Sequence, residues 1–331
     1  MEVEFASNLE TIGAVVIGRN EGQRLLKCIT SIRNSSSQIV YVDSGSADDS
    51  VVQAKLLGCD VVSLDMNFPF TAARARNAGL QFLLEKYEGV EFVQFVDGDC
   101  ELNSRWITCA HNYLLANANY AIACGRRRER FPEQTVYNSL CDIEWNTPIG
   151  DAKSCGGDAL IRASAILNVD GYRDTLIAGE EPEMCYRLRQ KNWKVVRLDK
   201  EMALHDAAIT KLSQWWQRSK RAGYAYMASA LLHGRAKERF RVREVIRILF
   251  WGGTLPAVFI AGLVIPLLSS TVLLVYLIQY FRLRRQAPTE RNLAAAWAFF
   301  LILGKFPEFL GVAKCLIDAL FTRQSTIIEY K

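Results

Sequence analysis

A long stretch without charge constrains this chain more than any other feature of its sequence. No Asp, Glu, Lys or Arg occurs between Ile248 and Phe281. This run is longer than the roughly 20 apolar residues that a helix needs to cross a bilayer. It contains Pro256 and Pro266, and basic residues flank both ends. Because basic flanks favour the cytoplasm, we expect a bent or re-entrant hairpin that turns near Pro266. A buried helical core of a soluble protein is the alternative.

The segments on either side of this run are also suited to a membrane surface. The apolar stretch from Leu293 to Gly304 is short for a span and continues into charged residues. We expect an interfacial or half-buried segment there, with a second span as the competing possibility. Residues 211–247 are basic and aromatic. They fit an amphipathic helix lying on the bilayer, or a face that meets a lipid diphosphate or a sugar ring.

The charge and cysteine patterns narrow the possible partners. The net charge is +5, and basic residues are concentrated in residues 211–247 and 282–291, which suits an anionic membrane surface. No nucleic-acid reader motif is present, so we expect no nucleic-acid partner. The nine cysteines contain no C-x-x-C pair, which argues for reduced thiols and against a disulfide framework or a zinc site. Residues 1–10 lack the apolar core of a signal peptide, so we expect the catalytic part to stay in the cytoplasm.

Residues 12–124 alternate between short apolar runs and helical patterns. Apolar runs at residues 12–17, 39–42, 60–64, 92–96 and 121–124 predict buried strands. Helical spacing lies between them, with helices expected at residues 50–57 and 70–85. A further strand is expected at residues 195–198. This order predicts an α/β fold with a mostly parallel sheet and helices on both faces.

The sequence Asp97-Gly98-Asp99 directly follows the buried strand of residues 92–96. Ligands bind at the carboxyl ends of strands in open α/β sheets. Two carboxylates separated by one glycine can face one hard cation, and Mg²⁺ or Mn²⁺ prefers oxygen ligands. A cation held there can bridge a diphosphate. A solvated turn is the alternative, because Asp-Gly is common in turns.

Five blocks in order resemble the family 2 inverting glycosyltransferases, which have the GT-A fold. The blocks are VVIGRNEG, YVDSGSADDS, FTAARARNAG, FVDGDCEL, and CGGDALIR followed by GYRDTLIAGEEPEMCYRLR. The resemblance covers about residues 10–210 and implies a nucleotide-diphospho-sugar donor. The hydrophobic tail is similar to that of members that elongate lipid-linked glycans.

The resemblance also implies roles for particular residues. Asp43 would lie near the base of the donor nucleotide, and Asn20 and Glu21 would lie near the nucleotide. Alternatively, Asp43 caps a helix or turn and Glu21 favours a helix start. Asp158 would meet the transferred sugar or the acceptor. The remaining implied donor and metal residues are Arg76, Asn77, Asp97, Asp99 and His205; Arg76 on a helix surface and a structural His205 are the alternatives.

The resemblance implies a single displacement at the anomeric carbon of the donor sugar. A carboxylate base deprotonates the acceptor hydroxyl, and Mg²⁺ or Mn²⁺ offsets the charge of the departing diphosphate. Family members usually place Glu-Asp where this chain has Glu180-Glu181. Glu181 is therefore the candidate base, and Glu183 is the fallback. An acidic helix N-terminus that is favoured by the helix dipole is the alternative.

These expectations combine into a membrane-associated enzyme at the cytoplasmic face of the inner membrane. We expect a GT-A catalytic domain at residues 1–210, a basic helical linker at 211–247 and membrane-associated helices at 248–331. The acceptor would be a lipid-linked or other envelope glycan. One alternative is a polyprenyl-phosphate glycosyltransferase, whose ionised acceptor needs no base. Another is a non-catalytic membrane scaffold that binds nucleotide.

Overall fold

The computed structural model describes residues 9–33 and 35–321. The N-terminal residues considered for a signal peptide lie largely outside this range. The chain divides into two compact units. The first unit comprises residues 1–130, 144–175 and 180–207, and the second comprises residues 131–143, 176–179 and 208–331. The expected division into catalytic domain, linker and membrane region stays a prediction.

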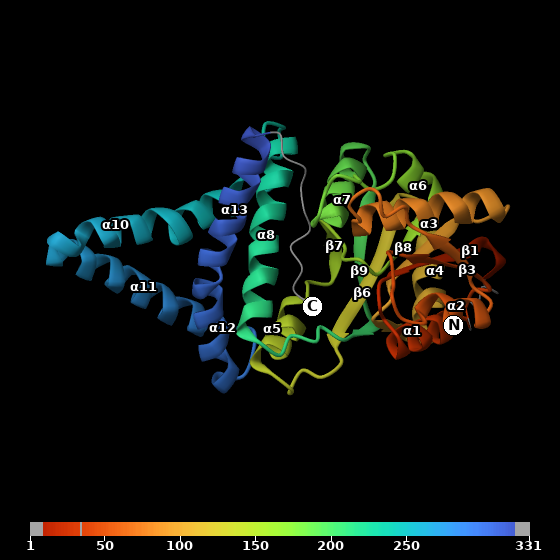
Figure 1. Ribbon diagram of the computed structural model, residues 1–331, viewed down its shortest axis with the longest axis horizontal. Coiled ribbons are helices and arrows are strands. Elements are labelled where there is room, and N and C mark those ends of the chain that lie inside the picture. Colours follow the sequence, from red (N-terminus) through yellow and green to blue (C-terminus); the bar gives the residue numbers. More distant parts are fainter. Residues whose placement is uncertain (1–8, 34, 322–331) are drawn as a thin grey trace. The chain divides into compact units, whose positions relative to one another are not determined.

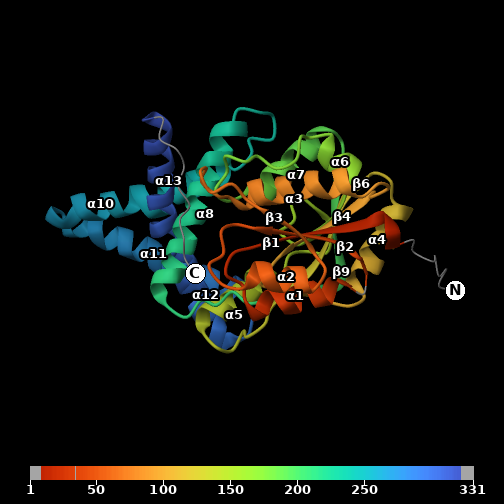
Figure 2. The same ribbon diagram turned by 45° about the vertical axis from the view of Figure 1, so that its right-hand side comes forward.

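The first unit contains a mixed sheet whose first four strands are parallel. These strands are β1 (Ile12–Gly18), β2 (Gln38–Asp43), β3 (Asp60–Ser63) and β4 (Phe92–Asp97), in the spatial order β3-β2-β1-β4. Figure 2 shows α3 (Ala72–Lys86) on one side of the sheet, and α1 (Gln23–Arg33) and α2 (Ser50–Leu56) on the other. The expected α/β fold is confirmed.

The remaining strands add antiparallel pairs to the parallel ones, so the sheet is mixed. Strand β8 (Ala159–Arg162) is antiparallel to both β4 and β6 (Tyr120–Glu129). Strand β9 (Lys194–His205) runs parallel to β6, and β5 (Cys100–Leu102) and β7 (Gly150–Ala152) pair antiparallel with β9. The helices of this part are α4 (Trp106–Ala116), α6 (Ala163–Leu167) and α7 (Glu180–Gln190).

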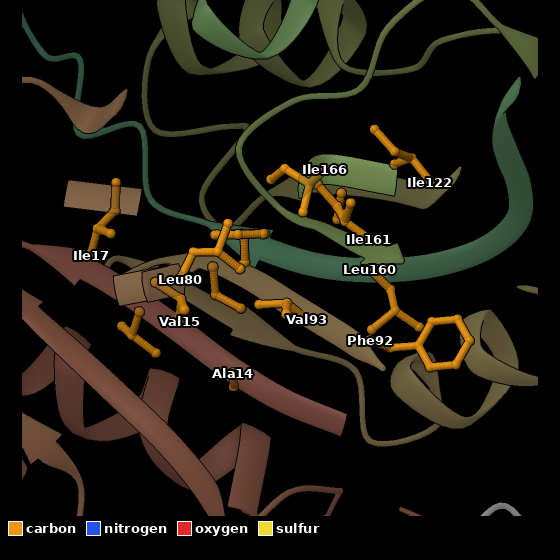
Figure 3. Packing of buried hydrophobic residues seen from close by; sticks show 14 of the residues in the cluster. Ala14, Val15, Ile17, Leu80, Phe92, Val93, Ile122, Leu160, Ile161 and Ile166 are labelled. Atoms are coloured by element: carbon orange, nitrogen blue, oxygen red, sulfur yellow. The ribbon is translucent and has the colours of Figure 1, made fainter. Parts of the chain in front are cut away.

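The core of the first unit lies between the sheet and its helices. Figure 3 shows side chains of β1, β4, β6 and β8 packed together with Leu80 of α3 and Ile166 of α6. Val15, Val93 and Ile161 are fully buried. A strand that is buried on both faces reads as an unbroken apolar run, which is why the sequence indicated β1, β2 and β4 so directly.

The second unit consists of helices. They are α5 (Val136–Glu144), α8 (Leu212–His233), α9 (Val242–Ile248), α10 (Leu255–Ala261), α11 (Pro266–Gln286), α12 (Arg291–Leu303) and α13 (Lys305–Leu320). A π-helical turn at Leu249–Thr254 joins α9 to α10. The helix breaks at Gly262–Val264, directly before Pro266, and α10 and α11 form a hairpin (Figure 1). The expected turn near Pro266 is confirmed.

Within the described residues, three helical stretches are long and apolar enough to cross a membrane: Val242–Val264, Pro266–Gln286 and Arg291–Leu320. The last of these is longer than the expected stretch of residues 293–304, and both the interfacial segment and the second span stay predictions. Helix α13 follows α12 directly after Gly304, and Pro307 is tolerated there because it lies in the first turn of α13. Lys305 pairs with Glu308 at 2.5 Å and Lys314 with Asp318 at 2.7 Å. These pairs reduce the cost of placing charged residues in an apolar helix.

Helices α8 and α13 approach each other closely because glycines face the partner backbone. A Cβ atom on Gly223 would overlap the carbonyl oxygen of Glu308, and one on Gly311 would overlap that of Lys220. Small residues allow such close helix packing where hydrophobic burial alone does not drive association. The α8–α13 pair therefore depends on glycine at both positions.

Candidate functional site

The register of the parallel strands brings the N-terminal site residues to one edge of the sheet. Ile17 of β1 lies opposite Asp97 of β4, and Gly18 lies opposite Asp43 of β2. The carboxyl ends of these three strands therefore lie at one edge of the sheet, where Asp43 ends β2 and Asp97 ends β4 on either side of β1. Asp99 lies two residues after Asp97, directly before β5.

Arg76 joins the Asp97 turn to the N-terminus of α7. Its Nη2 lies 2.8 Å from Asp97 Oδ1, and its Nη1 lies 2.8 Å from Glu180 Oε1 and 3.1 Å from Glu181 Oε1. The side chain is 2% exposed, so it is not a helix-surface arginine. Burial opposes ionisation of Asp97, but Arg76 and Arg127 outweigh it and lower its pKa. One guanidinium on α3 thus holds residues from two other parts of the chain, the end of β4 and the start of α7.

Asp158 contacts the backbone of Asp97 and is paired with a second arginine, Arg127. Its Oδ1 accepts a hydrogen bond from Asp97 N at 3.0 Å, and its Oδ2 lies 2.8 Å from Arg127 Nη2. Burial raises the pKa of Asp158, and Arg127 opposes this increase. The preceding Gly157 is required by space, because a Cβ atom there would lie 2.7 Å from Asp97 Oδ2.

Sequence reasoning did not identify Arg127 or the aromatic residue next to it. The Arg127 guanidinium lies 5.6 Å from the ring centre of Trp145. Trp145 also contacts the His205 ring, with 4.7 Å between ring centres. Arg127 is one of several consecutive arginines at the end of β6. The sequence of this segment therefore does not indicate which arginine faces the site.

His205 lies next to Asp99 because β5 and β9 pair antiparallel. Cys100 lies opposite His205 in this register. His205 Nε2 lies 3.2 Å from Asp99 Oδ2, and both residues are buried. A carboxylate suits Mn²⁺ and Mg²⁺, and an imidazole suits several divalent transition metals, so these residues fit a divalent cation. Asp97 is turned toward Arg76 instead, and its role as a further metal ligand stays a prediction.

Glu180 and Glu181 are the first two residues of α7, and both pair with Arg76. Glu183, in contrast, pairs with other arginines and has a structural role. Burial, followed by the charge of Glu180, raises the pKa of Glu181 from its ordinary value of 4.5 to about 7. Glu183 is fully buried and pairs with Arg187 at 2.8 Å and with Arg173 at 3.3 Å. Glu183, the fallback candidate for the base, is therefore already paired with two arginines.

The residues expected at the nucleotide hold the surrounding loops together. Asp43 Oδ2 accepts hydrogen bonds from Gly45 N at 3.1 Å and Ser46 N at 3.0 Å. Asn20 Oδ1 accepts one from Ala47 N at 2.7 Å, which ties the loop after β1 to the loop after β2. Glu21 pairs with Arg24 at 2.8 Å. Contacts of Asp43, Asn20 and Glu21 with a nucleotide stay predictions.

Asn77 faces away from Asp97 and binds the loop before α7. Its Nδ2 donates to Tyr172 O and to Asp174 Oδ1, both at 2.7 Å. Its Oδ1 accepts from Tyr172 N at 2.8 Å. The structure therefore shows Asn77 positioning residues 172–174, and its expected contact with the donor stays a prediction.

Comparison with known proteins links this arrangement to sugar transfer. The chain is 24% identical over 236 residues to a pre-mycofactocin glycosyltransferase of Mycobacterium tuberculosis, an alignment that covers 67% of this chain and 48% of the relative. It is 28% identical over 98 residues to the glycosyltransferase SunS of Bacillus subtilis, covering 28% of this chain and 21% of the relative. The chain thus spans about half the length of the first of these relatives.

A solved structure has the same fold. A mannosyltransferase from Pyrobaculum calidifontis, in complex with GDP-Man and Mn²⁺, superimposes with a TM-score of 0.59 at 14% identity, covering 93% of this chain and 87% of that one. Residues 14–155 match the model of glycosyl transferase family 2. This match includes most of β1, the strands β2 to β7, the Asp97-Gly98-Asp99 turn and Arg76. The chain therefore contains a domain of glycosyl transferase family 2.

Proposed function

We propose that this protein is a membrane-associated, inverting glycosyltransferase that moves a sugar from a nucleotide-diphospho-sugar to a hydroxyl group of a lipid-linked glycan. One observation carries the proposal. A single buried arginine, Arg76, binds both the Asp97 turn and Glu181, and the pKa of Glu181 is raised to about 7. A carboxylate that gains and loses its proton near neutral pH is suited to act as a general base.

The proposed reaction is one displacement at the anomeric carbon. Glu181 takes the proton of the acceptor hydroxyl as the hydroxyl oxygen bonds to the anomeric carbon. The bond between that carbon and the diphosphate breaks, and the nucleoside diphosphate leaves with the bonding electrons. Attack from the face opposite the leaving group inverts the configuration. Arg76 keeps Glu181 and Asp97 in a fixed relation throughout.

The charges of the site support a divalent cation as cofactor. The carboxylates of Asp97, Asp99, Asp158, Glu180 and Glu181 outnumber the guanidinium groups of Arg76 and Arg127. A bound diphosphate would add further negative charge. Asp99 and His205 would hold Mn²⁺ or Mg²⁺, which supplies electrostatic stabilisation of the departing diphosphate. The Mn²⁺ and GDP-Man bound by the Pyrobaculum mannosyltransferase support this choice.

The C-terminal helices support a membrane location and a lipid-linked acceptor. Three stretches are apolar enough to span a bilayer, and basic residues lie before the first and at the end of the second. Basic flanks favour the cytoplasm. We therefore place the catalytic domain at the cytoplasmic face of the inner membrane, where a lipid-linked envelope glycan would meet a soluble nucleotide sugar.

The proposal is tested by donor cleavage with the purified full chain in detergent. A panel of UDP-, GDP- and dTDP-sugars is incubated with Mn²⁺ or Mg²⁺, and nucleoside diphosphate release is measured with and without membrane lipid extract. We expect metal-dependent release from one donor, stimulated by lipid extract. Asp99→Ala should abolish it, whereas Asp199→Ala, at a site 83% exposed in β9, should not. Nucleotide binding without release from any donor would favour the non-catalytic scaffold.

A further inference from the structure

An apolar groove lies between helices α10, α11 and α12 of the second unit. Its volume is about 840 Å³, and the side chains that line it are apolar or aromatic. The groove is open on one side, because Leu273, Leu277 and Phe299 are 57%, 51% and 52% exposed. All three helices belong to stretches that are apolar enough to cross a bilayer. Exposed apolar surface of this kind marks a contact with lipid or protein, so the groove needs an apolar occupant.

Aromatic contacts build the inner end of the groove. The Tyr276 ring of α11 stacks on Phe306 of α13 with 6.4 Å between ring centres, and it lies 5.6 Å from the Trp251 ring. The Tyr276 hydroxyl donates a hydrogen bond to Trp251 O at 2.5 Å. These contacts join α11 to two neighbouring segments, the π-helical turn and α13. The inner end is therefore held by contacts within the protein.

The opposite end of the groove is basic. Leu277, Tyr280 and Arg284 follow one another along α11 at intervals of three and four residues, which places them on one face of the helix. Leu277 and Tyr280 line the groove, so Arg284 extends that lining by one turn. Arg291 begins α12 at the same end. Residues 282–291 contain four arginines and one glutamate, so this end attracts an anionic group.

The length of the groove matches one leaflet of a bilayer. Val272 and Tyr280 are the first and last residues of α11 that line it. The helix between them rises about 12 Å, and Arg284 lies about 6 Å beyond Tyr280. Half of the hydrocarbon core of a bilayer is about 15 Å thick. A phospholipid acyl chain occupies one leaflet, whereas a polyprenyl chain is longer than one leaflet.

We propose that the groove binds an anionic phospholipid, with one acyl chain along α11 and the phosphate at Arg284 and Arg291. Arginine suits this role because its paired N–H groups match phosphate oxygens. The lipid would be a bound component of the membrane region and not the sugar acceptor. The inference rests on the membrane location proposed above, but it does not depend on glycosyl transfer.

Binding is measured by native mass spectrometry of the full chain, delipidated and released from detergent micelles. Phosphatidylglycerol is the anionic probe, and phosphatidylcholine with the same acyl chains has no net charge. Arg284→Gln removes the charge at the end of the groove. Arg282→Gln is the matched control, because Arg282 lies two residues from Tyr280 and therefore on the opposite face of α11.

Two bulky substitutions test the groove itself. Leu277→Trp would fill it, because Leu277 is one of its lining residues. Ile278→Trp is the matched control, because Ile278 is 59% exposed and does not line the groove. Polyprenyl phosphate is added as a competitor, and the oligomeric state is read from the same spectra. Circular dichroism checks that each variant keeps its fold.

We expect phosphatidylglycerol to bind the unmodified chain and both controls alike, and more tightly than phosphatidylcholine does. It should bind Arg284→Gln at least about fivefold more weakly, the usual effect of one arginine near an anionic lipid. Leu277→Trp should weaken binding similarly.

Four results would overturn the proposal. Equal losses in Arg282→Gln and Arg284→Gln would reduce the effect to general attraction by a basic surface. Equal affinity for phosphatidylcholine would exclude recognition of the anionic head. Tighter binding of polyprenyl phosphate would assign the groove to the acceptor. A dimer that Leu277→Trp dissociates would assign it to a second copy of the chain.

Discussion

Protonation of Glu181 should control the reaction near neutral pH. Burial and the neighbouring Glu180 raise its pKa to about 7. At that value about nine-tenths of the carboxyl groups are ionised at pH 8 and about one-tenth at pH 6. Because the base must be ionised to accept the hydroxyl proton, kcat/KM should fall about tenfold between pH 8 and pH 6. A carboxyl group with the ordinary value of 4.5 would be almost fully ionised at both.

The assay is the pH profile of sugar transfer at saturating metal. Nucleoside diphosphate release is followed at low donor and acceptor concentrations, so that kcat/KM is read directly. Glu201→Gln is the control, because Glu201 is 57% exposed on β9 and its loss should leave the profile unchanged. Glu181→Gln should lower kcat by roughly 10²–10⁴-fold, the usual contribution of a general base.

The same raised pKa has a consequence for stability. The folded state holds the Glu181 proton more tightly than the unfolded chain does. The contribution of this residue to stability is therefore fully present below pH 4.5 and is lost as the pH rises through about 7. An increase from 4.5 to about 7 corresponds to at most about 3 kcal/mol. Glu181→Gln should accordingly raise the Tm at pH 8 while it removes activity.

Two results would refute this reasoning. A kcat/KM that stays constant from pH 8 to pH 6 would mean that Glu181 does not titrate in that range or does not act as the base. Full activity of Glu181→Gln would favour an acceptor that is already ionised, such as a polyprenyl phosphate, because such an acceptor needs no base.

Three further changes test the metal site, the buried charges and the helix packing. Asp99→Asn should weaken Mn²⁺ binding at least about tenfold, measured by titration calorimetry without donor; unchanged binding would exclude this carboxylate as a ligand. Arg127→Met should destabilise the protein by about 3–5 kcal/mol in chemical unfolding because Asp158 is left buried and unpaired, and adding Asp158→Asn should restore most of that loss. Gly311→Leu should lower the Tm because its side chain would overlap the Lys220 carbonyl oxygen, and an unchanged Tm would contradict the close α8–α13 packing.

The parallel half of the sheet was predictable because its strands are apolar throughout. Strands β1, β2, β3 and β4 each coincide with an expected run. The helix expected at residues 70–85 is α3, and Thr71 accepts a hydrogen bond from Arg74 N at 3.1 Å at its start. Strand β8 was missed because a four-residue strand next to a helix gives no periodic signal.

The site was predictable only where motifs mark it. Asp97, Asp99 and Glu181 follow from blocks that the sequence displays. Arg127, Trp145 and Cys100 owe their positions to contacts between residues far apart in the chain, such as Arg127 with Asp158. Local patterns carry no information about such pairs. The alternative of a helix-surface position for Arg76 was wrong for a related reason, because its partners lie on β4 and α7.

The β5–β9 pair makes chain length matter more than residue identity around the candidate metal site. Successive strand residues point to opposite faces. If one residue were inserted between Asp99 and Leu102, or removed, the side chain opposite His205 would change faces. A substitution of Glu101, the partly exposed residue of β5, leaves this alignment intact, whereas a single-residue insertion separates His205 from its neighbours without altering any of them. Homologous chains should therefore keep a constant count of residues from the Asp-Gly-Asp turn to the end of β5.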